Sequence, residues 1–534
     1  MASMESAAST SSTTTADVTV MSAQVAALMR AKDEQITAQG EQIAALKHQI
    51  EWFRRQIFGQ KSERRLVEDA QQISLGEIVD QGSATAPTPM RRVVTQHTRA
   101  VSKTKDEGES LPFFDATQVP IETIELPVPA AIANEAYERI GQKITYRLAQ
   151  RPAAYVVLEY IRPLLKLRDS GRLVTTPAPG GVIEGSRADV SFLAGMLVDK
   201  YQYHQPLYRI HQRLTGNGFT LSRPWLTQLG QQSIALVEPI YQAQLASIKQ
   251  SRVITMDETP IKAGREVQGK MRTAWFWPVH GEQQKICFPY APTHQKEHIF
   301  KILGRRFSPD TVLLTDGNDS YARYAQVVGV DHAQCWAHAR RDFFEAKDYE
   351  PDRAEHALEL IARLYAIEDE IRERALVGDA KRWYRLEHSK AVTDVFFHWV
   401  ERELHADALK AKTPLTGALA YTHKRRAGLE LFLDDPDLPL DTNHLERGLR
   451  VIPMGRKNWL FCWTELGAEH LSIMQSLIVT CRLHGIDPYT YLVDVLQRVG
   501  IHPANRVAEL TPRLWKQHFA DNPLRSALHT MPTP

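Results

Sequence analysis

Three acidic residues of the sequence have positions that suit metal-dependent chemistry. Asp257 comes directly after the apolar run Val253–Met256, and Asp316 comes directly after the run TVLLT, so each is expected where a short buried strand ends. Glu446 lies on an expected helix within DTNHLERGLRVIPMGRKNWLF, residues 441–461. Two strand ends and one helix can bring three carboxylates together, and we expect these three to form one catalytic site.

The chemistry expected of this triad is displacement at a phosphodiester. Carboxylate oxygens are the ligands that Mg²⁺ prefers, and Mn²⁺ can substitute for it. Two such ions about 3.5–4 Å apart clamp the attacking and leaving oxygens, so no covalent enzyme intermediate is needed. Asp257 is expected to bridge the ions, whereas Asp316 and Glu446 each hold one.

The helix expected around Glu446 has two distinct faces. Its apolar face carries Leu445, Leu449 and Ile452, and Pro453 is expected to end the helix. Asn443, Glu446 and Arg450 share a different face at spacings of three and four. A competing interpretation makes Asn443 and Glu446 the two ends of a capping box, in which the glutamate only closes the helix start.

Basic, polar and aromatic side chains accompany the acids in the sequence. The candidates for DNA contact are Arg340, Arg341, Arg450, Arg456, Lys457, Asn458 and Trp459. Such groups suit phosphate contacts and base stacking, although a solvated basic face is the simpler alternative. Four further residues are expected to lie next to the acids and to position them without binding the metal: Glu258, Cys335, His338 and Asn443. Cys335 and His338 have metal-like spacing, but two ligands do not make a zinc site, so helix packing is the favoured interpretation.

Composition narrows the class of protein. No apolar run approaches the ~18 residues needed to cross a bilayer, and the N-terminus lacks a secretory signal, so we expect a cytoplasmic protein. Its four cysteines are scattered and support neither a disulfide framework nor a cysteine zinc site. Net charge is only +2, so nucleic-acid binding would depend on local basic patches. The segment GREVQGK lacks the Ser or Thr that ends a P-loop, which argues against ATP binding.

A heptad repeat near the N-terminus predicts self-association. Apolar residues recur every seven positions at Met29, Ile36, Ile43, Ile50 and Ile57. This spacing is typical of a coiled coil, and the alternative is an amphipathic helix lying on its own chain. The basic tail FRRQIFGQKSERR that follows can contact phosphate.

Four ordered motifs carry a resemblance to a known family. They are MDETP, LLTDGNDSY, CWAHARRDFFEA and NHLERGLRVIPMGRKNWLF. With these motifs the chain resembles a bacterial insertion-sequence transposase of the IS-sixty-six type. The resemblance implies metal-dependent DNA strand cleavage and strand transfer, with Asp257, Asp316 and Glu446 as a DDE triad that binds two Mg²⁺ ions. It also implies a ribonuclease-H-like core interrupted by a helical insertion.

Together these patterns predict a multidomain α/β protein. The expected parts are a disordered leader (1–20), a coiled-coil zipper with a basic tail (21–66), a linker (67–111), a small β-rich module (112–180), a helix-turn-helix-like DNA-binding region (181–250), the first part of the ribonuclease-H-like core (251–349), a helical insertion (350–430), the second part of the core with Glu446 (431–463) and a C-terminal helical domain (464–534). Members of the family usually carry a cysteine zinc module after the linker. No cysteine precedes Cys287 here, so no zinc is expected. For the helix-turn-helix region, an ordinary helical hairpin is the alternative.

The expected partners are double-stranded DNA, at the element ends and the target, and a second copy of the chain through the zipper. Elements of this family often encode small accessory proteins, which are further candidate partners. Two other functions compete with transposition: a non-catalytic coiled-coil DNA-binding regulator, and a metal-dependent nuclease without strand transfer. The presence of all three acids argues against the regulator.

The zipper generates the first prediction. Replacing Ile43 and Ile50 with Asp places charge in the apolar seam, so the oligomer should dissociate and the sedimenting mass should fall to that of a single chain. Replacing Glu41 with Gln, at a position of the same repeat outside the seam, is the control and should leave the mass unchanged. An oligomer of unchanged mass in the double variant would instead favour an amphipathic helix packed on its own chain.

Overall fold

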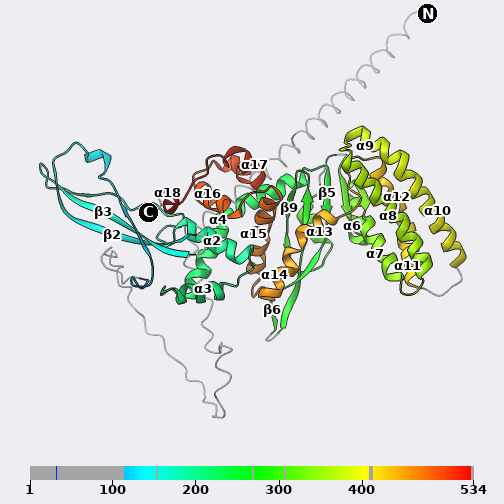
Figure 1. The fold of residues 1–534 in the computed structure, drawn as a ribbon, viewed down its shortest axis with the longest axis horizontal. Helices are drawn as coiled ribbons and strands as arrows, with labels where there is room; N and C mark the ends of the chain where they lie inside the picture. The colour runs from blue at the N-terminus through cyan, green and yellow to red at the C-terminus, as the bar shows by residue number, and fades with distance from the viewer. Residues whose placement is uncertain are drawn as a thin grey trace, which may run out of the picture. The chain divides into compact units, whose positions relative to one another are not determined.

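The computed structural model describes Lys32 and residues 113–530, apart from 152–153, 268–269, 306–307, 309 and 408–412. The chain divides into two units at Asp106–Glu107, and the described residues other than Lys32 belong to the second unit. The predicted leader, zipper and linker therefore lie outside the described residues, save Lys32. The second unit mixes helices with three β-sheets among its described residues (Figure 1).

A four-stranded sheet occupies the range in which a β-rich module is expected. Its strands are β1 (Ile121–Glu125), β2 (Tyr137–Arg151), β3 (Ala154–Leu167) and β4 (Leu173–Thr175). β3 is the central strand, because it pairs antiparallel with β2 and β4 and parallel with β1. Its run of Val, Leu, Tyr and Ile suits a strand that is buried along most of its length.

Three helices follow this sheet. They are α2 (Val190–Tyr201), α3 (Leu207–Gly216) and α4 (Arg223–Lys249). The apolar pattern predicts one continuous helix through α2 and α3. The helix is interrupted before Pro206, because proline lacks the N–H that a helix interior needs. Ser222 caps α4, because its hydroxyl accepts from the Trp225 N–H at 3.3 Å. DNA reading by α3 and α4 stays a prediction.

A five-stranded mixed sheet forms the centre of the unit, in the order β12–β11–β5–β8–β9. Its strands are β5 (Val253–Met256), β8 (Val279–Gly281), β9 (Lys285–Cys287), β11 (Val312–Thr315) and β12 (Asp331–Gln334). β5, β11 and β12 are parallel, whereas β8 and β9 run antiparallel beside β5. The residues of β5 and β11 are buried, as their apolar sequences require.

The segments MRTAWFWPVH and KICFPYAP, with the turn-like GEQQ between them, predict a meander after Asp257, and this prediction is wrong in one respect. The segment MRTAWFWPVH does not form one strand but divides between β7 (Lys270–Phe276) and β8, which belong to different sheets. Pro278 lies at the division, where a missing N–H interrupts the ladder. β7 instead pairs with β6 (Thr259–Val267) and β10 (Tyr290–Ala291). Within GREVQGK, the residues Gly264 to Val267 therefore lie in β6 and Lys270 begins β7, whereas a P-loop leads from a strand into a helix.

The helical insertion packs on the central sheet. Three helices precede the insertion: α5 (Glu297–Leu303), α6 (Asp319–Val328) and α7 (Trp336–Ala346). The described helices of the insertion are α8 (Pro351–Glu373), α9 (Gly378–Tyr384), α10 (Lys390–Asp407), α11 (Pro414–Lys424) and α12 (Arg426–Glu430). Figure 1 shows α7, α8, α10, α11 and α12 gathered into one bundle. Leu314 of β11 and Trp336 share an apolar cluster with Phe396 and Phe397 of α10, so the insertion does not have a separate core.

The last helices close the unit around α2 and α4. They are α13 (Asn443–Leu449), α14 (Val451–Trp459), α15 (Glu465–Leu483), α16 (Pro488–Arg498), α17 (Pro512–His518) and α18 (Ala527–Thr530). The prediction that the helix ends at Pro453 is wrong. Helix α13 ends before Arg450, a new helix begins directly after it, and Pro453 lies in the first turn of that helix, α14. A proline is tolerated there, since the first N–H groups of a helix have no intrahelical partner.

Arg385 yields a stability prediction for the insertion. Its guanidinium is buried, donates to both oxygens of Glu368 at 2.7 and 2.8 Å, and donates to the carbonyls of Phe432, Asp435 and Leu438. Arg385→Met leaves these acceptors unpaired, so the free energy of unfolding in urea should fall by about 3–5 kcal/mol. Arg382→Met is the control, because its pair with Asp434 is solvent-exposed and should change stability by less than about 1 kcal/mol.

Candidate active site

Asp257 and Asp316 lie at the same edge of the central sheet. They follow β5 and β11, which are parallel neighbours with Val312 opposite Val253 and Leu314 opposite Thr255. Continuing this register by two residues places Asp316 beside Asp257. The carboxyl ends of parallel strands thus bring together two acids that are 59 positions apart in the sequence.

Glu446 is positioned by contacts at the start of α13. The backbone N–H of Thr442 donates to the Cys335 sulfur at 3.3 Å, and the Trp336 N–H donates to the Leu440 carbonyl at 3.2 Å. The Tyr365 hydroxyl donates to Asp441 Oδ2 at 2.8 Å. Through these bonds α7 and α8 fix the turn from which α13 carries Glu446 to the sheet edge.

The capping-box interpretation of Asn443 and Glu446 does not hold. Thr442 is the N-cap residue, and no side chain caps the helix. The Asn443 N–H donates to Asp441 Oδ1 at 2.9 Å rather than to Glu446. The Glu446 carboxylate is therefore not engaged in closing its own helix.

One cleft brings the three acids together. It measures about 530 Å³ and is lined by Asp257, Glu258, Thr259, Trp275, Asp316, His338, Arg341, Glu446, Leu449, Arg450 and Pro453. The cleft thus contains the expected acids, two of the expected DNA-contacting arginines and two of the expected supporting residues. Trp275 was not anticipated from the sequence, because only the pairing of β7 with β6 brings it to this edge.

The electrostatic environment of the cleft is that of crowded carboxylates. Burial and the charges of Glu258, Asp316 and Glu446 raise the pKa of Asp257 to about 7, although the Glu258 N–H donates to its Oδ1 at 2.7 Å. Removal from water and like charges both disfavour the ionised carboxyl group. A bound cation would reverse this preference, because it favours the carboxylate form.

Glu258 ties the loops after β5 and β11 together. Its carboxylate accepts from the Asn318 amide at 3.0 Å, contacts His294 Nε2 at 3.2 Å and accepts from the Tyr321 hydroxyl. Asn318 in turn donates its backbone N–H to Asp316 Oδ1 at 3.0 Å. Asp319, which follows Asn318, is exposed and pairs with Lys424, so it does not join this network.

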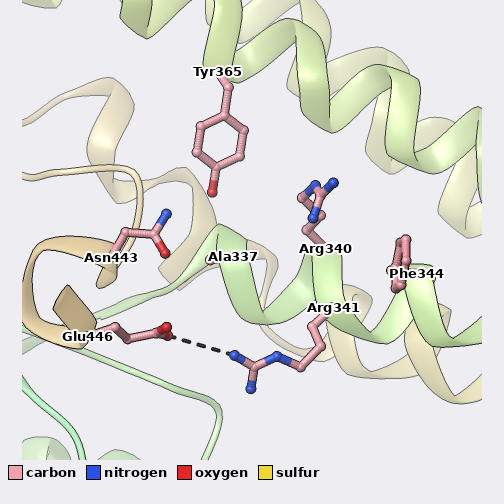
Figure 2. Close-up of a pocket in the computed structure, with 7 residues that line it drawn as sticks. All are labelled: Ala337, Arg340, Arg341, Phe344, Tyr365, Asn443 and Glu446. Atoms are coloured by element: carbon pink, nitrogen blue, oxygen red, sulfur yellow. Dashed lines mark ion pairs between the residues drawn. The ribbon is translucent and has the colours of Figure 1, made fainter. Parts of the chain in front are cut away.

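The cleft offers oxygen ligands of the kind that hard cations such as Mg²⁺ prefer, but these ligands are not close enough together to complete a metal site. Asp257, Asp316 and Glu446 offer carboxylate oxygens, which suit Mg²⁺. Yet in the described part of the chain no three Asp, Glu, His or Cys side chains lie close enough to hold a metal ion as they stand. Glu446 Oε1 lies 3.8 Å from Arg341 Nη2, an ion pair drawn as a dashed line in Figure 2.

His338 and Cys335 have different roles in the site. His338 lines the cleft, burial lowers its pKa, and its Nδ1 is buried without a hydrogen-bond partner among the described residues. Cys335 is buried behind the cleft and contacts Thr442, which is the packing role expected from the sequence. Among the described residues, Cys335 and His338 belong to no group of three His, Cys, Asp or Glu side chains placed to hold a metal ion.

The remaining DNA-contact candidates are distributed along α14. Lys457 and Asn458 are exposed, whereas Arg456 donates to the Pro260 carbonyl at 2.7 Å. Trp459 is partly buried against the core, so its indole is less available for stacking than expected. Trp463 is 62% exposed, and Arg265 lies 5.8 Å over its ring.

Comparisons with known proteins give a consistent result. The family described as "Transposase IS66 family" matches residues 185–470, more than half of the 534-residue chain. "IS66 C-terminal element" matches residues 476–513, and "Transposase C of IS166 homeodomain" matches residues 45–113. The four-stranded β1–β4 sheet lies between the segment matched at residues 45–113 and the segment matched at residues 185–470.

The curated relatives come from Sinorhizobium fredii (strain NBRC 101917 / NGR234). Uncharacterized protein y4hP is 30% identical over 508 residues, covering 90% of this chain and 90% of the relative. Uncharacterized protein y4jD is 28% identical over 515 residues, covering 91% and 98% respectively. Among the described residues, no helix is both long and apolar enough to cross a membrane.

The crowded acids generate a prediction about stability and pH. The raised pKa of Asp257 means that the folded wild type loses stability as pH rises from about 4, the ordinary value, to about 7. Asp257→Asn removes this titration, so in EDTA its melting temperature should exceed that of wild type by about 2 °C or more at pH 8 and by less at pH 5. Mg²⁺ should then raise the wild-type melting temperature more than that of the variant.

The control for this experiment is Asp319→Asn, which removes an exposed acid of the same loop region. Differential scanning fluorimetry at pH 5, 6, 7 and 8 follows all three proteins. A difference between wild type and Asp257→Asn that stays constant with pH would contradict the electrostatic account.

Proposed function

Because this chain belongs to the IS66 family of transposases, we propose that it cleaves DNA strands at the ends of an insertion sequence and joins them to a target through a DDE site. Asp257, Asp316 and Glu446 are the three acids of that site. The observation that carries the proposal is their convergence in one cleft from two strand ends and one helix.

The central sheet supports a ribonuclease-H-like assignment for the catalytic core. Three antiparallel strands, β9, β8 and β5, continue into the parallel strands β11 and β12. The two aspartates follow the two adjacent parallel strands at the centre of this sheet. The glutamate comes from a helix beyond a long helical insertion, in agreement with the interrupted core that the family resemblance implies.

The acids would hold two Mg²⁺ ions, which when bound polarise the phosphodiester and stabilise the leaving 3′ oxygen, and Mn²⁺ can take their place. The chain itself supplies the positions of the acids. Glu258 and Asn318 brace the loops of Asp257 and Asp316, while Cys335 and Tyr365 brace the start of α13. Preorganised groups of this kind avoid rearrangement during the reaction.

Arginines at the rim of the cleft provide the means to bind the substrate strand. Arg341 and Arg450 line the cleft and are exposed, and Arg340 immediately precedes Arg341 on α7. Guanidinium groups bind phosphate oxygens in a bidentate manner, which fixes the register of a strand without reading its sequence. We propose double-stranded DNA, at the element ends and the target, as the substrate, and the N-terminal zipper as the site of self-association.

Two other functions remain as outcomes of a test. A nuclease without strand transfer would use the same acids with water as the nucleophile. A non-catalytic DNA-binding regulator would not need three acids in one cleft, and the retention of all three favours an enzyme.

The triad can be tested by cleavage and joining assays. The labelled substrate is DNA taken from the flanks of the gene, incubated with Mg²⁺ and a target plasmid. Asp257→Asn, Asp316→Asn and Glu446→Gln should each lower cleavage and joining by at least about a hundred-fold, as removal of one charge-stabilising group does elsewhere. DNA binding measured in Ca²⁺ should change little.

Asp319→Asn is the matched control and should retain activity, because its carboxylate is exposed and paired with Lys424. Retained cleavage in any triad variant would remove that residue from the site. Cleavage by the wild type without joining would favour the nuclease, and binding without either reaction would favour the regulator.

A further inference from the structure

A second cavity adjoins the acidic cleft. It measures about 370 Å³, lies between α7, α8 and α13, and is lined by Ala337, Arg340, Arg341, Phe344, Tyr365, Asn443 and Glu446 (Figure 2). We call it the α7–α8 cavity. Arg341 and Glu446 line both the α7–α8 cavity and the acidic cleft, so the two spaces meet at this pair.

One face of α7 forms the floor of the α7–α8 cavity. Ala337, Arg340 and Arg341, and Phe344 follow at helical spacing, so they share this face. Phe344 is 58% exposed, which leaves most of an aromatic ring without a protein partner. Ala337, with its small side chain, leaves space open beside it.

The charge of the cavity is predominantly basic. Arg340 is exposed and makes no ion pair with any described residue, and the one described ion pair of Arg341 is the 3.8 Å contact with Glu446. Phosphate groups are the ligands that such guanidinium groups bind best. The aromatic ring next to them adds a surface on which a base can stack.

The opposite wall is fixed by hydrogen bonds. The Tyr365 hydroxyl donates to Asp441 Oδ2 at 2.8 Å, and the Asn443 amide donates to the same oxygen. In Figure 2 the Tyr365 ring reaches down from α8 towards Ala337 and Asn443. These bonds fix the wall, and among the described residues that line the cavity the only acid is Glu446, at the junction with the cleft.

We propose that the α7–α8 cavity binds one unpaired nucleotide of the DNA strand next to the bond that is cut, with its base against Phe344 and its phosphate at Arg340 and Arg341. This inference rests on the proposed function, because the neighbouring cleft then holds the scissile phosphate. Continuity of the two spaces and the complementary charge support a nucleotide rather than a protein segment. A base that enters the cavity leaves the duplex stack, so the strand is unpaired at this position.

The test replaces single bases of the end DNA with abasic sites. Full-length protein is mixed with a series of duplexes from the flanks of the gene, each with one abasic position, and affinity is measured in Ca²⁺ while cleavage is measured in Mg²⁺. For the wild type, one position near the cut should weaken binding by about five-fold to a hundred-fold, the range of base–aromatic stacking. Phe344→Ala should weaken binding of intact DNA by a similar factor and should lose the sensitivity to that abasic site.

Three further variants make the result specific. Phe344→Tyr keeps an aromatic ring and should behave as wild type, whereas Ala337→Leu fills the cavity without removing a functional group and should resemble Phe344→Ala. Tyr349→Ala is the control, because Tyr349 is 69% exposed just beyond α7 and lines neither cavity. Circular dichroism of each variant verifies the fold.

The outcomes separate this inference from the proposed function. Equal behaviour of Phe344→Ala and Tyr349→Ala, or additive effects of Phe344→Ala and the abasic site, would overturn the nucleotide cavity even where the wild type cleaves DNA. The Phe344-dependent abasic effect on binding, without any cleavage by the wild type, would support the cavity and count against the catalytic proposal.

Discussion

Carboxylates share a cleft only where rigid neighbours hold them, because their charges repel one another and burial disfavours their ionised forms. Here the backbone pairing of β5 with β11 provides that rigidity for Asp257 and Asp316, since both strands are buried and in fixed register. Glu446 depends on different bonds, from Thr442 to Cys335 and from Trp336 to the Leu440 carbonyl. The raised pKa of Asp257 reflects the electrostatic cost of bringing these groups together.

The helical insertion contributes directly to this arrangement. Its Tyr365 holds Asp441, immediately before the helix of Glu446, and Arg425, just after α11, donates to the carbonyl of Gly317, immediately after Asp316. The insertion therefore contacts the loops of two of the three acids. Because its apolar side chains share a cluster with Leu314 and Trp336, a movement of the insertion would be transmitted to the sheet edge. DNA bound along α7 would thus contact the element on which the site depends.

The β1–β4 sheet is held by strand pairing and apolar packing. It contains no cysteine, and the four cysteines of the chain lie elsewhere, with Cys287, Cys335 and Cys481 buried. The long antiparallel pairing of β2 with β3 and the packing of Leu148 and Val157 into the cluster that includes α2 hold it together.

Local sequence determined which residues could carry the chemistry. Apolar runs ending in Asp257 and Asp316 identified buried strands with acids at their ends, and Arg340 and Arg341 were recognised as candidate DNA contacts. It could not establish that MRTAWFWPVH divides between two sheets or that the helix at Glu446 breaks at Arg450. The first outcome depends on which strand each segment pairs with, and the second on the backbone continuing as helix α14 through Pro453 to Trp459. The tertiary structure alone placed Tyr365 and Trp275 at the site, because contacts between residues far apart in the chain leave no local pattern.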